Sequence, residues 1–244
     1  MLQSRGDHIE QMLEILQVEC RLTRSGQVPD AGMHPHAIFI SNCTGEITEK
    51  DVEPLAWFVR SGGYLFGSCW ALHETIEKVY PGAVRKFPYK GQVMDNVESS
   101  ICRPGSAFLS DVIDASAVPV YSLWGSHLIE ILDPDRVEVL IDSPWTEQKY
   151  GNGNMAAWFR TGHGLVLDSA NHFDRQGFEQ VIGLKTGEDR MAYAIDHMGL
   201  TYAEVREIPS KTWESGSKSN KDVRDLSAFR FITNFVREKR KSQE

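Results

Sequence analysis

Two short apolar runs, each followed directly by a helical pattern, constrain the fold of this sequence more than any other feature. Residues 37–40 form an unbroken apolar run, which is typical of a strand buried on both faces of a parallel sheet. A helical stripe follows that run, and residues 64–66 then form a second apolar run with another helical pattern after it. Strands that alternate with helices require right-handed crossovers and parallel pairing. The sequence therefore predicts an α/β domain that binds ligands at the carboxyl ends of its strands.

The helix between the two runs carries its own start and stop signals. Thr48 is followed three residues later by Asp51, which nearly matches a capping box, and apolar residues recur at helical spacing until Gly62 and Gly63 end the helix. Periodicity elsewhere predicts further elements. We expect helices over 7–18, 72–79, 188–197 and 226–237, strands over 19–23, 136–141, 154–159 and 164–167, and a mobile polar segment over 210–223.

The composition fits one domain in a reducing compartment. With 244 residues, 41% of them hydrophobic, the chain can bury a core without disulfides or metal, so we expect residues 1–244 to form a single domain. Its four cysteines are scattered, as expected for reduced thiols in the cytoplasm. A net charge of -8 disfavours nucleic acid as a partner, and no apolar run is long enough to cross a membrane. We therefore expect a small-molecule ligand or substrate, and the sequence leaves a homo-oligomer open.

The segment Gly67-Ser68-Cys69-Trp70-Ala71 places a cysteine on the turn between the second strand and its helix. The free amides and the positive dipole end of the following helix favour the thiolate form of such a cysteine. The small residues Gly67 and Ala71 let the backbone turn sharply, as in the nucleophile elbow of hydrolases. The pattern therefore predicts Cys69 as a nucleophile, although an inert buried thiol would fit the same position.

A thiol nucleophile needs a base, and His172 is the best candidate in the sequence. It follows the predicted strand over 164–167, so its imidazole can approach the carboxyl edge of the sheet. Asp174, two residues later, could orient the imidazole and support its positive form. The alternative is that His172 caps a turn and Asp174 begins a helix.

Acyl transfer also needs amide donors for the developing oxyanion. The amide of Trp70 follows the elbow, and the amide of Gly45 lies on the turn after the apolar run at residues 37–40. Glu46 on that turn could hydrogen-bond the site or simply start the next helix. His73 lies one helical turn beyond Cys69 and could touch substrate, or it could be an ordinary surface histidine.

One histidine pair resembles part of a metal site. His34 and His36 flank a proline, but no carboxylate or cysteine nearby in the sequence completes a ligand set. We therefore predict no metal and no cofactor.

Several segments resemble the class I glutamine amidotransferase-like superfamily, and most closely its trehalose-utilisation (ThuA-like) branch. Residues 42–48 resemble that branch's Asn-x-Thr-Gly turn after a buried strand, residues 58–67 its helix end and next strand, and residues 156–172 its late hairpin and terminal histidine. The resemblance implies a flavodoxin-like three-layer sandwich with a mostly parallel central sheet. It also implies Cys69 as nucleophile, His172 as base and Asp174 in the carboxylate role.

The sequence departs from the superfamily pattern at the elbow and at its start. Ala71 replaces the second elbow glycine, Asp174 replaces a glutamate, and Leu72 and His73 replace the residues that usually bind glutamine. The trehalose-utilisation branch usually lacks the elbow cysteine, whereas this chain has Cys69. The first strand of the fold is not visible before the helix predicted over 7–18, so we expect a truncated start or a rearranged sheet edge. The resemblance therefore does not predict glutamine as the substrate.

Together these features predict a cysteine-dependent hydrolase or amidase-like enzyme that acts on an acyl or C–N bond of a small molecule. The alternative is a non-catalytic domain of the same fold that binds a small polar or sugar-like ligand. For that ligand, four tryptophans offer stacking surfaces, unless they belong to the core: Trp70, Trp124, Trp145 and Trp158. The distance between the sulfur of Cys69 and the ring of His172 distinguishes the two hypotheses.

Overall fold

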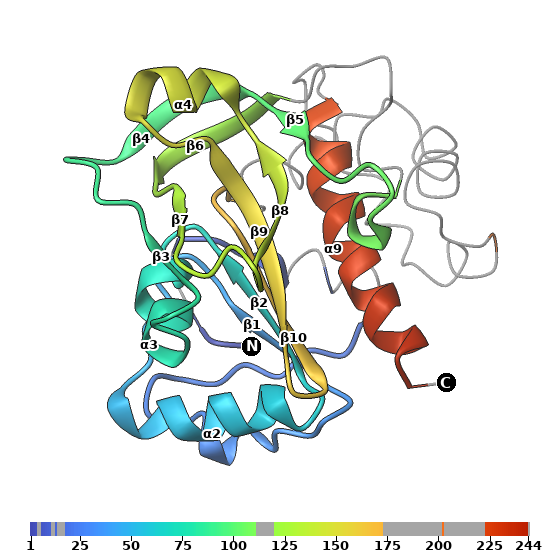
Figure 1. The fold of residues 1–244 in the computed structure, drawn as a ribbon. Coiled ribbons are helices and arrows are strands. Elements are labelled where there is room, and N and C mark those ends of the chain that lie inside the picture. The colour runs from blue at the N-terminus through green and yellow to red at the C-terminus, as the bar shows by residue number, and fades with distance from the viewer. Residues whose placement is uncertain are drawn as a thin grey trace, which may run out of the picture.

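A six-stranded mixed sheet forms the centre of the protein (Figure 1). The computed structural model describes residues 1–3, 6–10, 13, 18–110, 120–172, 202 and 223–243, and the statements below concern these residues. Across the sheet the strands are β1 (Ile38–Ser41), β2 (Tyr64–Ser68), β10 (Gly164–Ser169), β9 (Asn154–Thr161), β8 (Glu138–Asp142) and β5 (Ser100–Ile101). The predicted α/β class is confirmed.

Parallel pairing is limited to one half of this sheet. Strands β1, β2 and β10 run parallel, whereas β9, β8 and β5 are each antiparallel to their neighbours. The direction changes because β9 and β10 form a tight hairpin, in which Gly162 adopts a positive φ of 57°. The carboxyl ends of β1, β2 and β10 therefore lie next to one another at one edge of the sheet.

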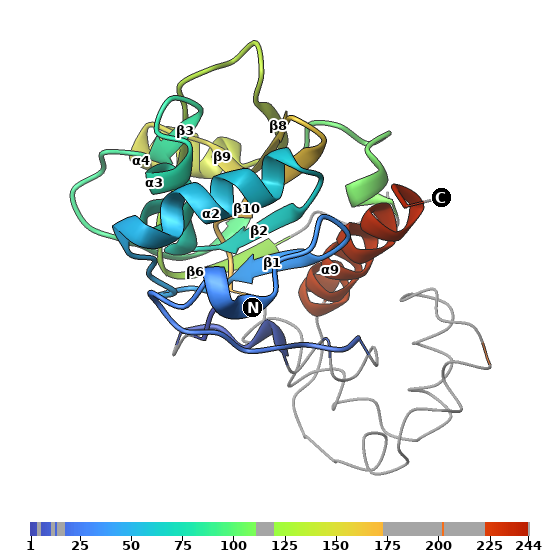
Figure 2. The same cartoon turned by 90° about the horizontal axis from the view of Figure 1, so that it is seen from below.

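Helices cover both faces of the sheet, as Figure 2 shows for α2 (Glu49–Arg60) and α9 (Val223–Lys241). Successive strand residues point to opposite faces: Phe66 packs with Phe231 and Phe235 of α9, whereas Leu65 belongs to the core beneath α2. The remaining helices are α3 (Glu77–Val79), preceded by a π-helical turn (Leu72–Ile76), α4 (Pro144–Tyr150) and the short 3-10 turns Pro29–Ala31 and Ala107–Leu109. This arrangement confirms a layered sandwich.

The local signals at the start of α2 behave as the sequence predicts. The Thr48 side chain and the Asp51 side chain each bond to the other residue's backbone, which completes a capping box. Asp51 also accepts hydrogen bonds from the amides of Gly26 and Val28, at 2.7 and 3.2 Å. A single capping residue thus fixes both the helix start and the loop before β1.

Two small antiparallel ribbons arise from the middle of the chain, where the sequence pattern is weak. β3 (Val84–Lys86) pairs with β7 (Ile129–Ile131), and β4 (Val93–Glu98) pairs with β6 (Val120–Ser126). The carboxyl end of β6 packs against the cysteine turn after β2, since Gly125 accepts a hydrogen bond of 2.8 Å from the Trp70 indole. These ribbons therefore help to close the edge of the sheet where β1 and β2 end.

Where the first strand of the fold is expected, Leu2 is the one described residue that pairs with β1. Leu2 forms parallel bridges to Ser41 and to Thr23, and its amide donates to the carbonyl of Ile40 at 2.8 Å. The strand predicted over 19–23 is therefore wrong in extent, because only Thr23 pairs. Of the helix predicted over 7–18, residues 9, 10 and 13 are described and helical, while the helix over 188–197 and the segment over 210–222 lie outside the described residues. Among the described helices none is long and apolar enough to span a membrane.

Candidate functional site

Three side chains that can carry chemistry meet where the parallel strands end. Cys43 follows β1, Cys69 follows β2, and His172 follows β10. The two sulfur atoms and a ring nitrogen of His172 all lie within 4.8 Å of one another. Because adjacent parallel strands bring their carboxyl ends together, this cluster is a direct consequence of the strand order β1-β2-β10. We call these three residues the thiol cluster.

Cys43, which the sequence analysis did not assign to the site, makes the shortest contact with the imidazole. Nε2 of His172 lies 3.0 Å from the sulfur of Cys43. Cys69 in turn forms a hydrogen bond with Cys43, and its sulfur lies 3.5 Å from Oγ of Ser126. His172 therefore reaches Cys69 through Cys43. The position of Cys43 in the sequence could have indicated its place in the site, because Cys43 follows β1 just as Cys69 follows β2.

Both cysteine turns hold a residue in the left-handed region. Cys69 has a φ of 51° and Thr44, next to Cys43, has a φ of 65°. For residues other than glycine such conformations cost about 1–3 kcal/mol and persist only where the surroundings impose them. At Cys69 the amide donates to the carbonyl of Ser169 at 2.8 Å, and at Cys43 the amide donates to Oγ of Ser68 at 3.0 Å. Neighbouring strand ends thus hold the two turns in place.

The electrostatics of the cluster place the negative charge on Cys43. The hydrogen bond from Cys69 lowers the pKa of Cys43 well below the usual thiol value. The hydrogen bond and the charge of His172 lower this pKa further, as does the amide of Trp70. Burial alone would raise it. Burial raises the pKa of Cys69, as do its hydrogen bond to Cys43 and the adjacent negative charge. One thiolate is therefore shared by the pair, with Cys43 as the charged sulfur and Cys69 as the S–H donor.

The predicted oxyanion donors differ in their availability. The amide of Trp70 bonds to the Cys43 sulfur, so it points into the cluster. The amide of Gly45 donates to the carbonyl of Asn42 at 2.7 Å, so in this arrangement it is used within its own turn. A tight turn after β1 uses that amide to close itself.

Glu46 and His73, which the sequence also predicts at the site, lie outside the thiol cluster. Glu46 is exposed and lies 3.4 Å from Nζ of Lys78. Nδ1 of His73 pairs with Glu77 at 3.0 Å along the helix surface. Asp174 lies outside the described residues.

Three buried polar side chains around the cluster have hydrogen-bonding atoms without partners among the described residues. These atoms are Oδ1 of Asn42, Nδ2 of Asn171 and both carboxyl oxygens of Asp168. Burial raises the pKa of Asp168 well above the usual carboxyl value, and the charge of Cys43 adds to this effect, so both favour the neutral form of the carboxyl group. Buried polar atoms are normally paired, and unpaired ones often mark a place where a ligand binds. The sequence offered no signal for Asp168, because it reads as an ordinary strand end.

The thiol cluster also has the donor types of a soft-metal site. Two sulfurs and an imidazole nitrogen are the usual ligands of Zn²⁺, and no other group of three such donors is close enough among the described residues. His34 and His36 stack on each other at a centroid distance of 4.8 Å and are not part of such a group. If this protein holds a metal within the described residues, the thiol cluster is the place.

The comparison with known proteins adds support for the fold. No protein-family model matches the chain, and no curated protein matches its sequence. A β-galactosidase from Rahnella sp. R3 is similar in structure, with a TM-score of 0.50, 13% identity, and coverage of 79% of this chain and 26% of that chain. The likeness supports the α/β fold with a central mixed sheet flanked by helices. Such a distant likeness concerns the fold alone, and the trehalose-utilisation branch is not shown.

Two further structures are similar at lower scores. A GH42 β-galactosidase from G. stearothermophilus has a TM-score of 0.47 and 11% identity, covering 78% of this chain and 25% of that chain. A cytoplasmic protein from Salmonella typhimurium has a TM-score of 0.49 and 12% identity, covering 79% of this chain and 87% of that chain. This chain thus spans about a quarter of the length of the galactosidases.

Proposed function

We propose that the protein is a cysteine-dependent hydrolase of the amidase type, acting on an acyl or C–N bond of a small molecule. The observation that carries this proposal is the distance of 3.0 Å between Nε2 of His172 and the sulfur of Cys43. A thiolate paired with an imidazole is an activated nucleophile beside its own general acid. The left-handed turn at Cys69 and the unpaired polar atoms around the cluster support the same function.

The proposed reaction uses the two cysteines in different roles. The Cys43 thiolate attacks the carbonyl carbon, so that a C–S bond forms and the C–N bond breaks, while His172 protonates the leaving nitrogen. Water, deprotonated by His172, then attacks the thioester, which releases the acid and restores the thiolate. Cys69 stabilises the resting thiolate through its S–H, and the Trp70 amide becomes a donor for the oxyanion as charge leaves the sulfur. Asp174 keeps the part that the sequence analysis assigned to it, which is to orient His172.

Substrate must open the site before it can reach the sulfur. Cys43 is 3% exposed and His172 is 4% exposed. Gly6 lies against the cluster, since a Cβ atom added to it would lie 3.0 Å from the sulfur of Cys43. We infer that the segment around Gly6 moves when substrate binds.

The test combines alkylation with trapping of the acyl-enzyme. Iodoacetamide at mildly acidic pH should label Cys43 before the other cysteines, and a p-nitrophenyl ester should leave its acyl group on Cys43 in an intact-mass measurement. Cys20→Ser and Cys102→Ser are matched controls, because both thiols are free and neither belongs to the cluster. Labelling of Cys43 no faster than that of Cys102 contradicts the proposal. Fast labelling without turnover of any ester or amide supports the non-catalytic ligand-binding alternative.

A second candidate function is a tetrahedral metal centre, which the mutual distances of at most 4.8 Å among the three donor atoms favour. Zn–S bonds of about 2.3 Å place ligand atoms somewhat closer than this limit, so small side-chain adjustments suffice. Titration with Co²⁺ should produce a sulfur-to-cobalt absorption band that Cys43→Ser and Cys69→Ser both abolish. Cys20→Ser and Cys102→Ser should leave the band intact. No band at one equivalent of Co²⁺ rules out the metal centre and leaves the hydrolase proposal standing.

A further inference from the structure

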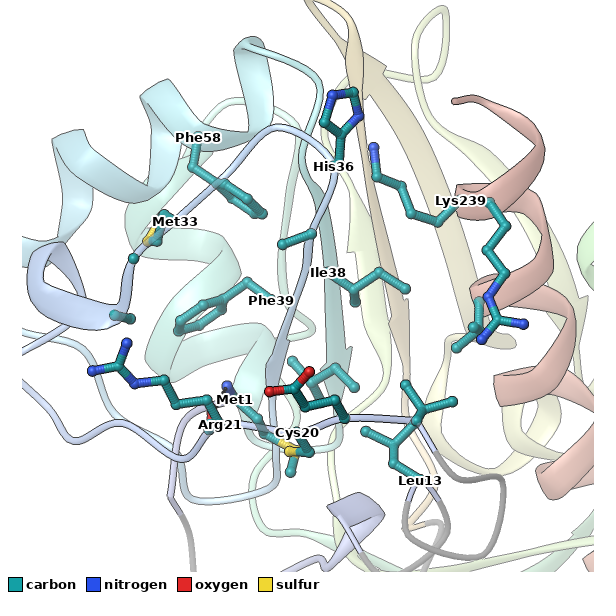
Figure 3. Close-up of a pocket in the computed structure, with 18 of the residues that line it drawn as sticks. Met1, Leu13, Cys20, Arg21, Met33, His36, Ile38, Phe39, Phe58 and Lys239 are labelled. Carbon is teal, nitrogen blue, oxygen red and sulfur yellow. Dashed lines mark hydrogen bonds between the residues drawn. The ribbon is translucent and has the colours of Figure 1, made fainter. Parts of the chain in front are cut away.

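A cavity of about 580 Å³ lies at the free edge of β1, apart from the thiol cluster (Figure 3). Residues of β1, the N-terminal segment and α9 form its walls, and neither the cluster cysteines nor His172 line it. Ile38, Phe39 and Phe58 supply an apolar surface, as Figure 3 shows. Among the described residues only Leu2 bridges the free edge of β1, at Ser41, so a full first strand is not formed there, and the cavity borders that place.

The cavity wall carries more positive than negative charge. Arg21, Lys239 and Arg240 line it, with Glu19 as the one acidic side chain in the lining. This is unexpected in a chain whose net charge is -8. Neither Arg21 nor Arg240 forms an ion pair with a described residue, whereas Arg85, for example, pairs with Glu130 at 2.7 Å. Among the described residues, no carboxylate therefore pairs with these two arginines.

Lys239 shows the charge imbalance most directly. Its residue is 5% exposed, and its ammonium group donates to the carbonyls of Pro35 and Gly62, each at 2.7 Å. Nζ also lies 4.6 Å from the centroid of the Tyr64 ring. Among the described residues no carboxylate pairs with it, and burial lowers the pKa of Lys239. A buried cation without a counter-ion is costly, because carbonyl dipoles and a ring replace its hydration only in part.

We propose that this cavity binds a small organic monocarboxylate, with the carboxylate at Lys239 and Arg240 and the apolar body against Ile38 and Phe39. The carboxylate would supply the counter-ion that Lys239 lacks among the described residues, and charge-assisted hydrogen bonds are the strong ones in a partly dry site. The apolar body would remove exposed hydrocarbon from water. This inference is independent of the proposed hydrolase function, because it uses none of the thiol cluster.

Calorimetric titration of the full chain with octanoate tests the proposal, and octan-1-ol is the uncharged comparison. Octanoate should bind at least about 10-fold more tightly than octan-1-ol, as expected if one charged hydrogen bond distinguishes them. Lys239→Met should weaken octanoate binding by a similar factor. Arg85→Met, which removes a cation on another surface, should leave binding unchanged.

Two further variants keep the test decisive if Lys239→Met unfolds, since that lysine also ties two loops together. Arg240→Met changes an exposed residue and should weaken octanoate binding with little effect on folding. Ile38→Trp should fill the cavity and abolish binding while every cation remains. Equal binding of octanoate and octan-1-ol, no binding of octanoate up to its solubility, or wild-type affinity in both Arg240→Met and Ile38→Trp would overturn the proposal.

Discussion

The turns after β1 and β2 are built alike but leave their cysteines in opposite states. Each follows a parallel strand, and each contains a residue with positive φ, Thr44 in one and Cys69 in the other. Yet the Cys43 sulfur contacts the imidazole of His172 and has a lowered pKa, whereas the Cys69 sulfur is fully buried and has a raised pKa. A strand-end turn therefore places a thiol at the edge of the sheet, and the groups around the thiol decide whether it ionises.

The largest expected effect comes from removing each sulfur in turn. Cys43→Ala should lower ester hydrolysis by about 1,000-fold or more, because it removes the proposed nucleophile. Cys69→Ala should lower it by about 10- to 100-fold, because it removes one hydrogen bond to a charged group. Steady-state rates on one p-nitrophenyl ester measure both. The reverse order of losses would make Cys69 the nucleophile and would break the assignment of roles.

The pH dependence of alkylation tests the same contrast between Cys43 and Cys69, because the thiolate is the form that reacts. An ordinary thiol has a pKa of about 8.5. The lowered pKa of Cys43 keeps its sulfur ionised at pH values where such a thiol is protonated. Its labelling rate should therefore fall only on the acid side, as the pH drops through the lowered pKa. In Cys69→Ala the lost S–H donor should move the inflection toward higher pH. An unchanged inflection would show that the two sulfurs do not share the charge.

Substitution at Gly67 tests how tightly the second turn is supported. Gly67 pairs in register with Ser41, but a Cβ at Gly67 would overlap the Asp168 carboxyl and lie 2.6 Å from Cδ1 of Ile76. Gly67→Ala should therefore lower the free energy of unfolding by about 1–3 kcal/mol. Urea denaturation measures this, with Gly82→Ala as the control, because a Cβ there meets nothing within 4 Å. Equal stability of the two variants would contradict the packing described for β2.

The smallest effect concerns the strain at the first turn. Thr44 is exposed and has a φ of 65°, so Thr44→Gly should stabilise the protein by up to about 1 kcal/mol through relief of the left-handed conformation. Thr44→Ala removes the same side chain but keeps the strain, so it should not stabilise. Thermal unfolding of both variants measures the difference. If Thr44→Ala stabilises as much as Thr44→Gly, the positive φ is not the cause.

Local features were predictable because short-range interactions produce them. The capping box at Thr48 and Asp51, the apolar runs that became β1 and β2, and the hairpin around Gly162 are all confirmed. Predictions failed where pairing partners decide the outcome. Only Thr23 of the strand expected over 19–23 pairs.

Periodicity and turn chemistry act over a few residues, so the α/β layer order and the cysteine on each of two strand-to-helix turns follow from the amino-acid sequence. The folded arrangement alone brings His172 to Cys43, which is 129 residues away, and buries Asp168 beside the pair. It also decided that Lys239 lies in a cavity without a carboxylate partner among the described residues. The charge state of a side chain depends on its burial and on the groups nearest to it. Strand order selects those groups, and no local sequence pattern encodes strand order.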